Sequence, residues 1–278
     1  MKRVLTAAAI SAAMLSQPAL AQEESPRGDW EGGYIGGTFG LGAQSNDVGE
    51  TVLFDTNRDG NFNDTVRTVA GADAFSGTGG FCNGKNFSNN AAGGCSNDRD
   101  SYDYSVRAGY DTQFGRIVVG ALVEASKSDS VDYVTAFSTT PASYRFERKL
   151  DYSVGARGRV GFAAKGALFY ATGGAAYGTI KNRFFTTNGV NSFADNGKTR
   201  SWGYTVGGGA EVKITDNITM GLEYLRTQFT KDKFVVNVGP GAAPPTNPFL
   251  LVSGGTDFRR SDPDFTQQAI RLTTSIRF

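Results

Sequence analysis

Apolar and polar residues alternate along several stretches of the chain, most regularly between residues 201 and 229. The first half alternates Tyr, Val and Ala with Thr, Gly and Glu, and the second half alternates Met, Leu and Tyr with Thr, Gly and Glu. Successive side chains of a β-strand point to opposite faces, so each half predicts a strand with one apolar face and one small or polar face. The turn from Thr215 to Asn217 would join the two strands into a hairpin.

The same alternation predicts about eight strands in the whole chain. They cover residues 30–43, 102–111, 116–126, 150–162, 167–180, 201–214, 218–229 and 265–278. In the fourth strand, Leu150, Tyr152 and Val154 are expected to share the apolar face. The assignment of faces is less clear in two strands. Residues 116–126 place Val118 and Leu122 on the face of Glu124, and residues 167–180 are mostly small on both faces.

Long and short connections alternate between these strands. Residues 44–101, 127–149, 181–200 and 230–264 are long, whereas the intervening turns are short. This arrangement is typical of an outer-membrane barrel, which is apolar toward lipid and polar inside and has long extracellular loops. A soluble sandwich could carry the alternation but has no reason to separate loop lengths by end. We therefore expect an all-β fold, an eight-stranded antiparallel up-and-down transmembrane β-barrel with long extracellular loops.

The N-terminus has the three parts of a secretory signal peptide. Lys2 and Arg3 are followed by a largely apolar segment of residues 4–15, and Ala19 and Ala21 supply a small-x-small cleavage site. This order predicts a signal peptide over residues 1–21 and a barrel domain over residues 22–278; the alternative is an N-terminal helix of the folded domain. After residue 25 no apolar run approaches the roughly 20 residues of a spanning helix.

Several segments resemble one family of membrane proteins. They are the signal peptide and the strands GGYIGGTFG, ARGRVGFA, LFYATGGAAYG and YTVGGGAEVKITDNITMGLEYL. Together they resemble the small porin-family outer-membrane β-barrels of Gram-negative bacteria, a group of abundant surface antigens with an OmpA-like eight-stranded domain. The resemblance implies location in the outer membrane, and the terminal Phe278 resembles the signal that the barrel assembly machinery reads. The long first loop departs from the family pattern, so no particular loop function is implied.

Composition narrows the possible functions. The chain has no histidine, which removes Ser-His-Asp and Cys-His catalysis and histidine-based metal sites, so we expect no enzyme. A formal net charge of +1 gives no indication of nucleic-acid binding. We expect a structural or surface-interaction role in envelope integrity, adhesion or antigenicity, with outer-membrane lipid and lipopolysaccharide as partners and any surface ligand unidentified. The alternative is a narrow porin-like channel for ions or small solutes.

A set of charged residues falls on the predicted inward face of the barrel. These residues are Glu124, Arg157, Arg159, Glu211, Glu223 and Arg271. An arginine on the lipid face would cost roughly 2–4 kcal/mol at the membrane midplane, which supports their inward placement. Because eight strands leave an interior just wide enough for side chains, we favour a mutually paired plug over an open pore.

The first long connection contains two candidate sites. Cys82 and Cys95 lie in one polar stretch and, in an exported protein, are expected to form a disulfide; two free thiols are the alternative. Upstream, the oxygen-bearing side chains Asp55, Asn57, Asp59, Asn61 and Asp64 match the start of an EF-hand loop with Gly60 at the sharp turn. Val66 replaces the usual bidentate Glu, so a weak Ca²⁺ site competes with a loop of Asx-turns. No other cofactor is expected.

An apolar run, Phe249 to Val252, follows the turn residues of the last long connection. It could be an adhesive tip or touch lipopolysaccharide, but a strand extension or packing against a neighbouring loop is the favoured interpretation.

Overall fold

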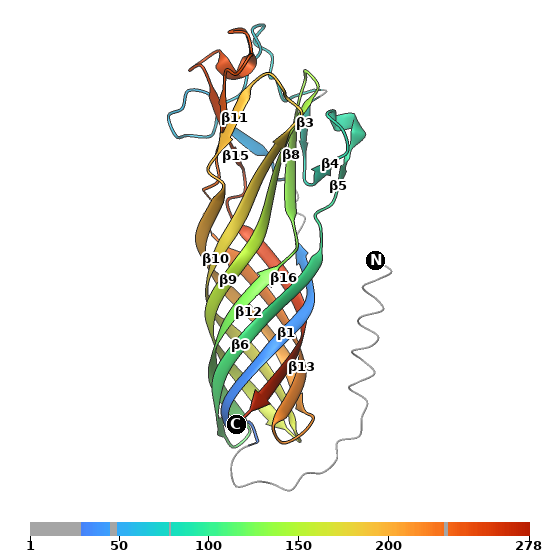
Figure 1. The fold of residues 1–278 in the computed structure, drawn as a ribbon, viewed down its shortest axis with the longest axis vertical. Helices are drawn as coiled ribbons and strands as arrows, with labels where there is room; N and C mark the ends of the chain where they lie inside the picture. Colours follow the sequence, from blue (N-terminus) through green and yellow to red (C-terminus); the bar gives the residue numbers. More distant parts are fainter. Residues whose placement is uncertain (1–28, 45–48, 78, 231–232) are drawn as a thin grey trace.

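Eight long strands close into an antiparallel barrel (Figure 1). The computed structural model describes residues 29–44, 49–77, 79–230 and 233–278, so the expected signal peptide lies outside the described residues. The barrel strands are β1 (Gly32–Gln44), β6 (Ser101–Phe114), β7 (Ile117–Ser128), β9 (Ala142–Ala164), β10 (Ala167–Thr186), β12 (Lys198–Lys213), β13 (Ile218–Phe229) and β16 (Phe265–Arg277). β1 pairs with both β6 and β16, and β9 pairs with both β7 and β10, which leaves the ring without a free edge. The predicted eight-stranded barrel is confirmed.

The two faces of each strand follow the predicted alternation. Outward apolar side chains such as Ile35 and Val123 are more than half exposed, whereas inward Glu211 and Glu223 are almost completely buried. A soluble protein would bury the first set and expose the second. The wall of the barrel is therefore built for lipid outside and for paired polar groups inside.

The predicted orientation of one residue, Leu150 at the start of the fourth predicted strand, is wrong. Leu150 was expected to face outward with Tyr152, but it is buried inside the upper barrel. The pairing shifts between Thr179 and Ile180, since Thr179 lies opposite Tyr152 and Ile180 lies opposite Leu150. Asp151 is the extra residue of this bulge, and one inserted residue reverses which face each later side chain occupies.

Short turns join the strands at the end of the barrel where both described termini lie (Figure 1). The turn between β9 and β10 consists of Lys165 and Gly166, and both have positive φ angles. Two central residues with positive φ match the twist of a hairpin and allow the tightest connection between strands. This is the periplasmic end of an outer-membrane barrel, and the long connections lie at the external end.

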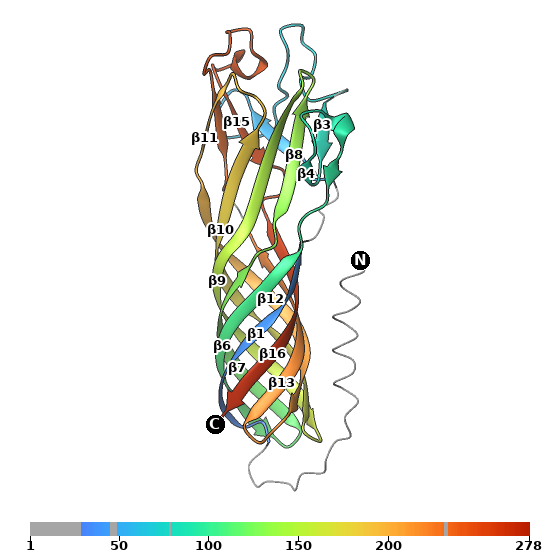
Figure 2. The same cartoon turned by 45° about the vertical axis from the view of Figure 1, so that its right-hand side comes forward.

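At the external end the long connections fold into a β-sandwich, here called the external sandwich (Figure 2). One sheet continues the barrel: the outer parts of β9 and β10 are extended by β8 (Asp132–Ser138) and β3 (Gly80–Cys82). The second sheet has the order β11 (Ser192–Asp195), β14 (Val236–Gly239), β15 (Thr256–Arg260) and β2 (Val52–Asp55). A small hairpin of β4 (Lys85–Asn86) and β5 (Cys95–Ser96), with the 3-10 turns η1 (Ala91–Gly93) and η2 (Pro248–Leu250), completes it.

The external sandwich has its own hydrophobic core. Its largest buried side chains come from both sheets and from the connections between them: Phe54, Phe75, Tyr144, Phe146, Phe234, Phe249 and Phe258. Phe249, in η2, therefore packs against neighbouring segments as favoured above, while Leu251 and Val252 remain exposed. Among the described residues, helices long and apolar enough to cross a membrane are absent.

Candidate functional site

The six charged residues predicted for the lumen lie together inside the barrel. Arg157 is 2.7 Å from Glu124 and 3.2 Å from Glu223, measured between guanidinium nitrogen and carboxylate oxygen. Arg271 is 2.7 Å from Glu124 by the same measure, and Arg159 is 3.2 Å from Glu211. They come from β7, β9, β12, β13 and β16, so these ion pairs tie opposite walls of the barrel together.

Four further charged residues belong to the same network. Arg107 pairs with Glu211 at 2.8 Å and Glu223 at 3.7 Å; Arg271 also pairs with Asp103, and Asp111 accepts hydrogen bonds from Arg159 and Arg277. Sequence reasoning did not single these residues out, although the two-residue repeat places all four inward. The network contains five arginines and five carboxylates, so its charges balance: Arg107, Arg157, Arg159, Arg271 and Arg277 with Asp103, Asp111, Glu124, Glu211 and Glu223.

Aromatic rings fill the space around the arginines. The guanidinium carbon of Arg159 lies 4.6 Å from the ring centroid of Tyr34 and 5.2 Å from that of Tyr170. The Tyr170 hydroxyl donates a hydrogen bond to Glu223 at 3.0 Å. Desolvated cation–π contacts of this kind add to the attraction between the charges. The rings also occupy volume that water would need.

The lumen is closed at the level of this network. The side chains of Arg107 and Glu223 are both 0% exposed. Water passing through the barrel would touch the side chains that line its path, so fully buried charges exclude an open aqueous passage here. The arrangement is in keeping with the mutually paired plug expected from the diameter of eight strands, and a non-conducting lumen stays a prediction.

Other buried layers lie on both sides of the network. Near the periplasmic turns, Trp30, Val118 and Leu168 form a buried apolar cluster with Ala163 and Tyr170. Toward the outside, Ile180, Phe229 and Phe265 form a second cluster with Leu150. Polar and apolar layers therefore alternate along the axis.

A second buried ionic cluster joins the barrel to the external sandwich. Arg260 of β15 donates to Glu50 at 2.6 Å, and Arg148 of β9 donates to Asp132 of β8 at 2.5 Å. Arg260 also pairs with Asp132, so the cluster links both sheets of the sandwich. Asp98 lies beside it and accepts a hydrogen bond from the Tyr133 amide; burial and the Asp132 charge raise the pKa of Asp98 to about 7.

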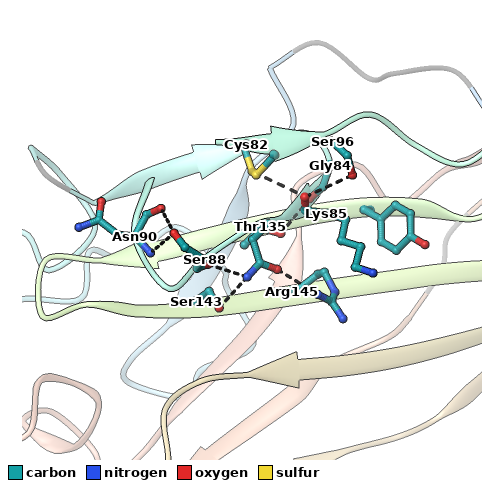
Figure 3. The surroundings of a disulfide bond; sticks show 12 residues. Cys82, Gly84, Lys85, Ser88, Asn90, Ser96, Thr135, Ser143 and Arg145 are labelled. Atoms are coloured by element: carbon teal, nitrogen blue, oxygen red, sulfur yellow. Dashed lines mark hydrogen bonds between the residues drawn. A yellow bond between two sulfur atoms is a disulfide. The ribbon is translucent and has the colours of Figure 1, made fainter. Parts of the chain in front are cut away.

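The disulfide between Cys82 and Cys95 closes the β4–β5 hairpin onto the external sandwich (Figure 3). Next to it, the Thr135 hydroxyl of β8 donates to the Gly84 carbonyl at 2.8 Å. The Asn86 side-chain amide donates to the Ser143 hydroxyl at 3.1 Å and its oxygen accepts from Arg145 at 3.0 Å. The predicted pairing of the cysteines thus fixes a hairpin that also docks on the β8–β9 strands.

The acidic loop expected to bind calcium is held by its own backbone. Asp55 accepts hydrogen bonds from the amides of Asp59 and Gly60, and Asp64 accepts from the amide and hydroxyl of Thr56. Asn57 accepts from the Asp59 amide in the same way. In the part of the chain that the structure describes, there is no cluster of three or more Asp, Glu, Cys or His side chains able to hold a metal ion. These contacts are those of Asx-turns, and calcium binding by the five residues stays a prediction.

The fold and the sealed, charge-paired lumen define an integral β-barrel of the outer membrane. The chain belongs to the family described as the outer membrane protein beta-barrel domain, whose model matches residues 6–278.

Two curated relatives are similar over about half of the chain. The chain is 35% identical over 144 residues to a 22 kDa outer membrane protein of Rhizobium leguminosarum bv. viciae, covering 51% of this chain and 60% of that protein. It is 33% identical over 135 residues to a 31 kDa outer-membrane immunogenic protein of Brucella melitensis biotype 1, covering 47% of this chain and 55% of that protein. The chain thus spans somewhat more than half the length of these relatives.

Solved structures are similar at low sequence identity. The outer membrane protein OprG from Pseudomonas aeruginosa is 10% identical, with a TM-score of 0.48 over 89% of this chain and 97% of OprG. Neisserial surface protein A is also 10% identical, with a TM-score of 0.34 over 88% of this chain and 97% of that protein.

Proposed function

We propose that the protein is a non-conducting outer-membrane anchor that holds a folded β-sandwich at the cell surface, where it contributes to envelope integrity and surface contact. The closed ionic network of the lumen is the observation that carries this proposal, because it uses the barrel interior for cohesion. The hydrophobic core of the external sandwich supports the proposed role in surface contact, since a rigid folded unit presents a defined surface. The immunogenic name of the Brucella relative is in keeping with exposure of such a surface.

The proposal assigns the protein no catalytic role. The chain has no histidine, and the buried carboxylates of the lumen are paired with arginines rather than aligned with a nucleophile. Insertion through the terminal Phe278 by the barrel assembly machinery is part of the same proposal.

Single-channel recording of the purified, refolded protein in planar bilayers tests the central claim. We expect no discrete conductance steps with the native chain. A positive control is a variant in which Arg107, Arg157 and Glu223 are replaced by Gly, which empties the middle of the lumen. Reproducible unitary steps from the native protein would contradict the proposal.

A narrow channel is the second candidate, and one observation favours it. Buried nitrogens of Arg107 and Arg277 and one oxygen of Glu211 have no hydrogen-bond partner within the described structure. Arginines with spare donors can exchange partners, and a network that rearranged could open a path for small ions. Voltage-dependent steps in the same recordings, abolished when Arg107 is replaced, would support this alternative.

A further inference from the structure

A row of lysines crosses the outer surface of the barrel at its external end. Lys149 on β9 lies directly opposite Lys181 on β10, and Lys181 lies directly opposite Lys198 on β12. Lys127 on β7 and Arg200 on β12 flank the row, and all five positions have the outward parity of their strands. Like charges directly opposite each other on neighbouring strands destabilise a sheet. The direct opposition of the three lysines therefore does not stabilise the sheet.

Two carboxylates offset only part of the charge. Lys149 pairs with Asp129 and Lys198 pairs with Asp151, each at 2.6 Å between nitrogen and oxygen. Among the described residues, the central Lys181 makes no direct ion pair and shares only the more distant charge of Asp151, and Arg200 makes no direct ion pair either. The row therefore keeps an excess of positive charge that an external anion can neutralise.

The height of the row on the barrel matches the lipid headgroups. Outward aromatic side chains, Tyr152, Tyr177 and Trp202, form the belt that marks the edge of the hydrocarbon layer. Lys181 lies four residues beyond Tyr177, a rise of about 13 Å along the strand and about 10 Å along the membrane normal at a tilt near 40°. This distance places the ammonium groups at the level of the phosphates, outside the hydrocarbon layer.

An apolar groove begins just below the row, on the same face. It has a volume of about 590 Å³ and runs across β1, β6, β7, β9, β10 and β12, so its part on β9, β10 and β12 lies below the row. Its lining combines the small residues Ala125, Ala156 and Ala175 with the aromatic residues Tyr177 and Trp202. The small residues leave space on this shallow surface that a lipid chain can occupy without displacing a side chain.

We propose that the lysine row and the groove together form a binding site for one phosphorylated glycolipid of the outer leaflet, the lipid A part of lipopolysaccharide. Its phosphates lie against Lys149, Lys181 and Lys198, and Arg200 donates from below. An acyl chain of the same molecule lies in the groove beside Trp202. This site is independent of the proposed function, since a conducting barrel would carry it equally well.

The test is a titration of the folded full-length mature barrel in detergent. Two probes are compared, hexa-acyl lipid A with both phosphates and the same lipid without phosphates, and bound lipid is counted by native mass spectrometry. A cation at an anionic lipid surface contributes about fivefold in affinity, so three lysines give the native protein a preference of about a hundredfold for the phosphorylated lipid at low salt. Trp202 is one of two tryptophans, and Trp30 is buried, so a change in emission on binding reports on the groove.

Three sets of substitutions identify the contributions. Lys149→Gln, Lys181→Gln and Lys198→Gln together are expected to abolish the preference. The matched control, Lys85→Gln, Lys165→Gln and Lys233→Gln, removes three exposed lysines elsewhere and is expected to keep it. Ala175→Leu fills the groove and is expected to weaken both lipids equally.

Two results would overturn the site. One is a native protein that binds both lipids with equal affinity, and the other is a triple row variant that keeps the native preference. Heat-modifiable gel mobility verifies that each variant is folded. If the triple row variant does not fold, the single Lys181→Gln variant is used, and an unchanged preference in it counts equally against the site. We expect the same variants to behave like the native protein in planar-bilayer recordings. Failure of the lipid-binding site is therefore distinguishable from failure of the proposed function.

Discussion

At the scale of single residues, four of the five buried arginines of the lumen each contact two carboxylates, and Arg277 contacts Asp111 alone. Arg107 contacts both Glu211 and Glu223, and its side chain is fully buried. Removing one member of a buried ionic pair leaves its partner charged and desolvated, which costs far more than the pair itself contributes. Substitution of a single charged residue in the lumen should therefore destabilise the fold strongly, even though the net charge of the network is zero.

We expect Arg107→Met to lower the free energy of unfolding by about 3–5 kcal/mol, because Glu211 and Glu223 lose a shared partner. Urea-induced unfolding in detergent, followed by heat-modifiable gel mobility, measures the change. Arg116→Met is the matched control, since Arg116 is exposed in the turn between β6 and β7 and should change stability by less than about 1 kcal/mol. Equal stability of the two variants would contradict a cohesive role for the network.

Asp98 predicts a pH dependence of the external sandwich. Burial, followed by the charge of Asp132, raises its pKa from 3.8 to about 7, while Arg260 and the Tyr133 amide act in the opposite direction. The folded state thus favours the protonated carboxyl, so this contribution to stability is full below about pH 4 and is lost as the pH rises through about 7.

The sandwich should therefore resist unfolding better at pH 5 than at pH 8, by roughly 1 kcal/mol after allowing for the partial exposure of Asp98. Denaturant-dependent proteolysis of the external segments at the two pH values measures this difference in the stability of the sandwich. Asp98→Asn keeps the acceptor for the Tyr133 amide and should reduce the difference. A difference of the same size in this variant would assign the pH effect to another group.

At the scale of elements, the disulfide holds the β4–β5 hairpin, which has few ladder hydrogen bonds of its own. Cys82 and Cys95 are separated by 13 positions, and a crosslink across such a loop contributes about 3 kcal/mol in the chain-entropy model. We expect the double variant Cys82→Ser and Cys95→Ser to expose this hairpin to proteases while the barrel keeps its heat-modifiable mobility. Unchanged cleavage would mean that hydrogen bonds such as those of Asn86 and Gly84 hold the hairpin without the disulfide.

The barrel strands were predictable because lipid imposes a strict two-residue repeat on each of them. Leu150 was assigned to the wrong face because the Asp151 bulge is set by pairing with β10, which the local pattern does not encode. Inward Arg107 and Asp111 were available from the same repeat but were not selected. The inference that the inward charges pair with one another needed only the small diameter of the barrel.

The external sandwich was not predictable in this way. Its second sheet takes short strands from three separate long connections, with β14 and β15 from the same one, and β2, β11, β14 and β15 have four or five residues each. Segments so short carry too few alternations to be distinguished from loops. Their pairing depends on contacts between residues such as Phe54 and Phe258, which are about two hundred positions apart.

At the scale of the whole molecule, two cohesive units share β9 and β10. The barrel is closed by its own ring of hydrogen bonds and by the lumen network, while the sandwich has a separate aromatic core. Phe258 is central to that core and contacts Phe54, Tyr144 and Phe249. Because the barrel ring closes without any of these residues, loss of the sandwich core should leave the barrel intact.

Phe258→Ala separates the two units experimentally. Removing a buried phenyl ring costs about 3–5 kcal/mol, which is enough to unfold a small sandwich. Because Phe258 lies outside the membrane, this loss of stability should not reach the barrel. Proteases added to whole cells should then cleave the external segments, while the barrel keeps its native heat-modifiable mobility. Phe87→Ala is the control, since Phe87 is 71% exposed and makes little contribution to packing. If Phe258→Ala instead unfolds the barrel at the same denaturant concentration as the sandwich, the two form a single cooperative unit, and the membrane part cannot be regarded as an independent anchor.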